Sequence, residues 1–180
     1  MSLTHIDGLP AHVLFVHFIV VMVPLTALAA IVCAIRPRYA RRLGLTLPVL
    51  GLVTLAMVPV TTHAGEWLQS RVGHDPLVEK HTELGDGLLP WAGALFLVTA
   101  AVWWMGRRLA AQDAQPAAEG GQAPAAGAWW RAPRALHLTA VVLAVVIGTG
   151  AVVDVYRIGE SGAKAAWHDN YDKSASGQPG

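Results

Sequence analysis

The chain has 180 residues, of which 54% are hydrophobic and only 14% are charged. Soluble domains carry about 25% charged residues, so this chain has too little polar surface for an ordinary water-soluble fold. Its formal net charge is +1 and it has no basic stripe, which argues against nucleic acid as a partner. The single cysteine, Cys33, lies in an apolar run and excludes a disulfide framework, so we interpret it as a core residue.

Four segments are long and apolar enough to cross a bilayer as helices, which requires about 20 mostly apolar residues. They are residues 11–35, 43–62, 84–106 and 135–156. No Lys or Arg precedes the first segment, so we interpret it as a retained span and not as a cleaved signal peptide. The sequence therefore predicts a single-domain, all-α integral membrane protein, a four-helix bundle surrounded by the lipid bilayer.

Two segments show no periodic apolar face. Residues 110–128 are rich in Ala, Gly, Gln and Pro, which is typical of a flexible linker. Residues 168–180 are polar and are expected to form a disordered tail.

The basic residues predict the orientation of the spans. Arginines cluster in the loops after the first and third spans: Arg36, Arg38, Arg41, Arg42, Arg107, Arg108, Arg131 and Arg134. Basic residues next to span ends mark the cytoplasmic side. We therefore expect these two loops, including the 110–128 linker, in the cytoplasm and both termini on the outer side.

Four histidines then fall at the outer end of three different spans. His12 and His17 are in the first span, His63 ends the second, and His81 precedes the third. Glu66 follows His63 by three residues and shares its face if the helix continues. His17 lies deepest, among Val, Phe and Ile, where an unpaired polar group costs several kcal/mol. We expect His81, Glu66 or Asp154 to be its hydrogen-bond partner.

This pattern predicts a polar, His-lined pocket at the outer membrane face, with two alternative ligands. Facing imidazoles in a four-helix bundle can hold b-type haem, for which the pair would be His17 and His81. Imidazoles with a carboxylate can hold a transition-metal ion, and the set would be His12, His63, Glu66 and His81. The simpler alternative is that the histidines at the interface are solvated or cap helix ends. His12 and His17 are about 140° apart around a straight helix, which separates their side chains.

The opening stretch GLPAHVLFVHFIV resembles the HPxxVHFPIA start of a bacterial four-helix membrane family known as domain of unknown function 2231. The resemblance continues through TTHAGEWL, EKHTELGD and GTGAVVDVYRIGESGAKAAW, and it covers nearly the whole chain except the linker and tail. Val13 and Ile19 stand where the family usually has proline. The resemblance implies a four-span fold in a bacterial cell membrane and supplies no established activity.

Three functions stay open from the sequence. The first is an accessory or interaction protein, with a membrane-protein partner or as a homo-oligomer. The second is a redox membrane protein that binds b-type haem or a metal ion. The third is a transporter component, although no inverted repeat is apparent. Ser70 lacks the flanking glycines of a nucleophile elbow, and no catalytic motif is found, so the sequence leaves open whether the chain is an enzyme.

The predicted orientation is tested by cysteine labelling in intact cells. In a Cys33→Ala background, a cysteine at Ser2 should react with a membrane-impermeant maleimide, and a cysteine at Gln112 should react only after the cells are permeabilised. Labelling of position 112 in intact cells would invert the orientation.

Overall fold

The computed structural model describes residues 5–6, 9–71, 75–113 and 131–175. In these residues four helical stretches are long and apolar enough to cross a membrane: Ala11–Ile35, Thr46–Gln69, Pro76–Arg108 and Arg134–Trp167. The prediction of an all-α chain with four candidate spans is therefore confirmed.

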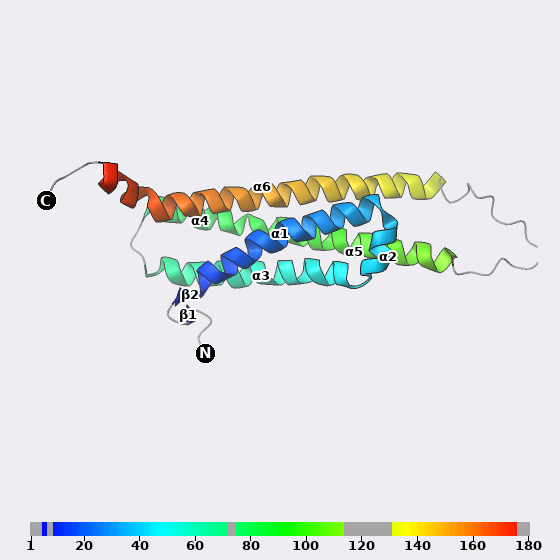
Figure 1. The fold of residues 1–180 in the computed structure, drawn as a ribbon, viewed down its shortest axis with the longest axis horizontal. Helices are drawn as coiled ribbons and strands as arrows, with labels where there is room; N and C mark the ends of the chain where they lie inside the picture. The colour runs from blue at the N-terminus through cyan, green and yellow to red at the C-terminus, as the bar shows by residue number, and fades with distance from the viewer. Residues whose placement is uncertain (1–4, 7–8, 72–74, 114–130, 176–180) are drawn as a thin grey trace, which may run out of the picture.

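The described elements follow in a simple order (Figure 1). Two short antiparallel strands, β1 (His5–Ile6) and β2 (Leu9–Pro10), precede the first helix. The helices are α1 (Ala11–Ile35), α2 (Pro37–Leu43), α3 (Thr46–Gln69), α4 (Pro76–Asp86), α5 (Leu88–Asp113) and α6 (Arg131–Ala175).

The long helices form a bundle in which α1 packs against α3 and α6, and α5 packs against the same two helices. Figure 1 shows α2 at one end of the bundle and the β1–β2 hairpin near the other. The core between the helices is made of small and branched side chains, among them the fully buried Val23, Leu47, Val58 and Leu95. Many large apolar side chains remain exposed, as expected for helices whose outer faces contact lipid.

Buried threonines link α1 and α3 near the middle of the bundle. The hydroxyl of Thr54 donates a hydrogen bond to the carbonyl of Leu50, with 2.9 Å between the oxygens. Thr26 is 2.9 Å from the same hydroxyl oxygen, and because the proton of Thr54 is already used, Thr26 is the donor. This pair satisfies two polar groups inside an apolar region and joins the two helices there.

Glycines allow close approach of helices where a side chain would not fit. Gly148 of α6 faces Ala27 and Ile31 of α1, and Gly51 of α3 faces the hydroxyl of Thr99 in α5. Gly150, one half-turn from Gly148, faces the indole ring of Trp91 in α5. Small residues at such positions let transmembrane helices pack closely.

The helices extend further than hydropathy indicates. The second predicted span, 43–62, becomes α3 over Thr46–Gln69, and the third, 84–106, is preceded by α4. Asp75 is the N-cap of α4: its Oδ1 accepts a hydrogen bond from the Leu77 amide nitrogen, with 2.8 Å between the two atoms. These extensions lie where the helices leave the apolar zone, so an apolar window does not detect them.

The two predicted irregular segments also differ from expectation where they are described. The linker 110–128 begins inside α5, which continues to Asp113, and residues 114–128 lie outside the described residues. Disorder was expected over 168–180, but α6 is helical through Ala175; residues 176–180 lie outside the described residues. The Ala and Lys residues of the preceding GAKAAW are good helix formers, which explains why the helix continues beyond the membrane span.

A pair of substitutions in α6 tests the packing. Gly150→Ala places a methyl group where the Trp91 indole lies, so we expect a loss of about 1–3 kcal/mol in stability, as for other overpacked cores. Gly159→Ala is the matched control, because no atom lies within contact distance of a Cβ there. Thermal unfolding in detergent should show a lower midpoint for Gly150→Ala only. Equal midpoints for the two variants would contradict the close contact with Trp91.

Candidate histidine site

His12 lies in the first turn of α1 and bonds to α3. Its Nδ1 is 3.0 Å from the carbonyl oxygen of Thr61. A carbonyl can only accept, so Nδ1 carries the hydrogen. The ring lies against Gly65, one helical turn after Thr61, where a Cβ would be 3.0 Å from the ring carbon Cε1. Gly65 therefore provides the space that His12 needs to reach the α3 backbone.

His81 of α4 bonds to α6 in a similar way. Its Nδ1 is 2.9 Å from the hydroxyl oxygen of Ser161. The Ser161 hydroxyl donates its own proton to the carbonyl of Ile158, at 2.8 Å, so it accepts from Nδ1 of His81. Gly162 lies against the ring, and a Cβ there would be 3.0 Å from Cε1.

The two imidazole rings lie next to each other between the helices. Their centroids are 6.3 Å apart and their planes form an angle of 80°. Both side chains are partly buried. We assign the hydrogen of each neutral ring to Nδ1 from its hydrogen-bond partner. The Nε2 atom of each ring then carries a free electron pair, which makes it a hydrogen-bond acceptor or a metal ligand.

His17 does not join this pair. It lies on the exposed side of α1, and its Nδ1 is 2.6 Å from the carbonyl oxygen of Val13, one turn earlier in the same helix. The expected bond to another helix is therefore not formed, and His17 and His81 do not make a haem pair in this structure. The reason is the rotation of about 140° between His12 and His17: with His12 facing α3, His17 faces outward.

His63 and Glu66 also lie apart from the pair. They face each other along α3, with 3.7 Å between Nδ1 and Oε2, and their side chains are 79% and 62% exposed. Among the described residues, no group of three or more His, Cys, Asp or Glu side chains is placed to hold a metal ion. The four-residue ligand set expected from the sequence is therefore divided into two pairs on different faces of the bundle.

Asp154 was the expected fourth-helix partner of His17. Its Oδ2 is buried and has no hydrogen-bond partner among the described residues. It lies on the inner side of α6 near Gly87, the residue that separates α4 from α5. Asp154 therefore does not bond to His17.

Sequence reasoning missed the residues that position the histidine pair. None of these residues belongs to a recognisable motif. They are Thr61, which acts through its backbone carbonyl, Ser161, which acts through its hydroxyl, and the glycines Gly65 and Gly162. The available signal is the SG dipeptide in the otherwise polar GESGAK stretch, because a hydroxyl next to a glycine can both accept from a ring and make room for it.

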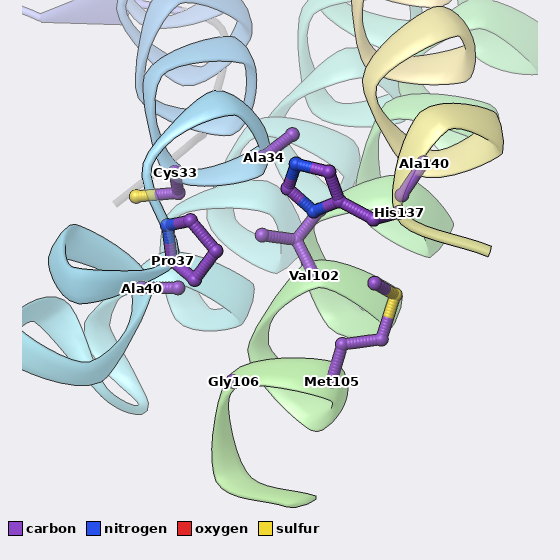
Figure 2. A pocket seen from close by; sticks show the side chains of 9 residues that line it. All are labelled: Cys33, Ala34, Pro37, Ala40, Val102, Met105, Gly106, His137 and Ala140. Atoms are coloured by element: carbon purple, nitrogen blue, oxygen red, sulfur yellow. The ribbon is translucent and has the colours of Figure 1, made fainter. Parts of the chain in front are cut away.

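The opposite end of the bundle holds a small cavity of about 20 Å³, enough for about one water molecule. It lies between α1, α2, α5 and α6, and its lining includes Cys33, Met105 and His137 (Figure 2). Figure 2 shows the sulfur of Cys33 pointing away from His137, with the sulfur of Met105 on the other side. These three side chains do not converge, so they do not form a ligand set.

Residues 8–174 match the family model described as "Predicted membrane protein (DUF2231)", and the chain belongs to this family. This match covers almost the whole chain and agrees with the four candidate spans. No curated protein and no solved structure matches the chain. The family description names a membrane protein and no activity.

A double-mutant cycle tests the bond between α4 and α6. His81→Ala and Ser161→Ala each remove one partner, so we expect a coupling of about 0.5–1.5 kcal/mol between them in the free energy of unfolding in detergent. His17→Ala combined with Ser161→Ala is the control and should be additive. A coupling of zero for His81 and Ser161 would show that the two side chains do not interact.

Proposed function

We propose that this chain is an accessory membrane protein that binds one monovalent copper ion between His12 and His81. The observation that carries the proposal is the pair of rings with both Nδ1 atoms engaged by other helices. Histidines that bind metals commonly donate the second ring N–H to a carbonyl or another polar group, which fixes the tautomer and the ring orientation. Imidazole is a ligand for copper, zinc, iron and nickel.

The distance between the rings restricts the geometry of the ion. A metal–nitrogen bond of about 2.0–2.1 Å, added to about 1.1–1.2 Å from the ring centre to Nε2, puts an ion about 3.2 Å from each centroid. One ion can therefore join two rings whose centroids are at most about 6.4 Å apart, and a separation near this limit requires a nearly straight nitrogen–metal–nitrogen angle. The observed 6.3 Å is close to this limit.

A straight, two-coordinate arrangement favours a monovalent ion. Cu(I) and Ag(I) accept two nitrogen ligands on opposite sides, whereas structural Zn²⁺ has four ligands in a tetrahedron. Rotation of either ring about a straight axis changes neither bond, so the 80° angle between the planes is compatible with this geometry. Two histidines from different helices would supply the two nitrogen ligands of such an ion.

The packing around the rings favours a bare ion over b-type haem. Haem iron with two axial histidines also has a straight nitrogen–iron–nitrogen axis, so the ring separation alone does not distinguish the two ligands. A macrocycle, however, extends far beyond the rings in every direction across that axis. Gly65 and Gly162 already lie against the Cε1 edges of His12 and His81, so a macrocycle would have to separate α3 and α6 from the rings.

The proposal includes the orientation of the site. The arginine bias supports a cytoplasmic α2 and a cytoplasmic α5–α6 connection, and the proposed site then lies at the outer face of a bacterial cell membrane. An ion that enters from outside would then reach the site without crossing the bilayer. An accessory role follows from this placement: the chain would hold the ion at the membrane surface and present it to a partner.

Metal titration of the purified protein tests this proposal. In a Cys33→Ala background, Ag(I) as a redox-stable substitute for Cu(I) should bind once per chain, measured by calorimetry in detergent. His12→Asn and His81→Asn are the informative variants, because the Asn amide keeps a donor at the position of Nδ1 and lacks Nε2. Each should weaken binding by at least the roughly 10- to 100-fold that loss of an outer-shell partner costs.

The controls are His17→Ala and His63→Ala, which should bind like the parent protein. Unchanged binding in His12→Asn and His81→Asn would overturn the proposed site. If the isolated protein instead carries haem, its reduced form should show sharp visible absorption bands that are absent in His81→Asn, and these bands would identify haem as the ligand of this site.

A further inference from the structure

The end of the bundle opposite the histidine pair carries exposed arginines in α5 and in or next to α2. We call this set the arginine collar: Arg36, Arg38, Arg42, Arg107 and Arg108. The elements that carry it meet at this end, because the small cavity there is lined by Pro37 and Ala40 of α2, Gly106 of α5 and His137 of α6. Figure 2 shows these four residues around the cavity.

Aromatic rings hold several of these guanidinium groups. The Cζ atom of Arg108 is 4.5 Å from the ring centroid of Trp104, that of Arg107 is 5.4 Å from Trp103, and that of Arg38 is 5.0 Å from Tyr39. Trp and Tyr are the residues that occupy the headgroup level of a membrane. Stacking on them keeps a guanidinium at the same level.

The charge of the collar calls for an anion. Apart from Asp113, which ends α5 on the collar side, the carboxylates of the membrane helices and of α4 belong to the other half of the molecule: Glu66, Asp75, Glu79, Glu83, Asp86, Asp154 and Glu160. Guanidinium groups bind phosphate oxygens through two parallel hydrogen bonds. At the boundary of an apolar span, the phosphate present at high concentration is that of a phospholipid.

An apolar groove lies directly beside the collar. It runs between α5 and α6, has a volume of about 110 Å³, and is lined by Val98, Ala101, Met105, Leu136, Thr139 and Leu143, among others. Arg108 follows Met105 by three residues, so it is the next residue on the face of α5 that lines the groove. The groove therefore offers space for part of an acyl chain immediately below a phosphate-binding side chain.

We propose that this groove and the arginine collar form a binding site for an anionic phospholipid, with its phosphate on Arg108 and a stretch of one acyl chain between α5 and α6. The site is separate from the histidine pair and does not depend on the proposed metal. Two observations select a lipid: the collar requires an anion, and the adjoining groove requires an apolar chain. A free phosphate would satisfy only the first requirement.

Native mass spectrometry of the protein in neutral detergent tests the proposal. Phosphatidylglycerol should bind the monomer as a discrete adduct and raise the thermal midpoint, and phosphatidylcholine with the same acyl chains should bind more weakly. Arg108→Gln should weaken phosphatidylglycerol binding about fivefold, the contribution of one basic residue at an anionic surface. Ala101→Phe should reduce binding of both lipids, because its ring fills the groove.

Arg71→Gln is the matched control. Arg71 also stacks on a tryptophan, with its Cζ 4.6 Å from the Trp67 ring, but it lies at the histidine end of the bundle. The Arg71→Gln variant should bind phosphatidylglycerol like the parent protein.

The proposal is overturned if Arg71→Gln and Arg108→Gln lose affinity equally, or if the two lipids bind the parent equally. It is also overturned if inorganic phosphate alone raises the midpoint as much as phosphatidylglycerol, or if the groove is occupied by a second copy, seen as a dimer without lipid.

Discussion

Within a bilayer, polar groups have no water to bond, and the bundle meets this constraint by bonds between its helices. Thr26 and Thr54 join α1 to α3 in the apolar zone, and His12 bonds α1 to the backbone of α3. At the end of this zone, His81 bonds α4 to α6. Apolar contact alone does not drive helices together in lipid, because the acyl chains are equally apolar. These few polar contacts, together with the glycines that allow close approach, therefore determine how the helices face one another.

The rotation of each helix explains why the sequence predicts the fold better than the site. Hydropathy locates a span along the chain, and it placed all four. It does not report which side of a span faces the bundle, because all sides of these helices are apolar. His12 and His17 show the consequence: both are in one span, but only His12 faces another helix. His63 and Glu66 likewise share a face of α3, and that face is exposed.

The partners of the histidine pair were beyond prediction for a different reason. Gly65 and Gly162 matter because of what a side chain there would displace, which is visible only when the facing ring is known. Ser161 lies 80 residues from His81, and no local pattern connects them.

The ends of the spans were underestimated for a third reason: α3, α4 and α6 continue as helices in polar sequence, where an apolar window has no signal.

The two ends of the bundle differ in chemistry, and this difference follows from the distribution of charge along the chain. At one end, histidines and described carboxylates lie among short polar helical extensions, where rings can be oriented by backbone and hydroxyl groups. At the other end, arginines stack on aromatic residues beside an apolar groove. A protein anchored to anionic lipid at the arginine end would hold the histidine pair at a fixed height on the opposite face. For the proposed transfer of an ion, a fixed height would keep the histidine pair within reach of a membrane-protein partner that holds its own site at that level.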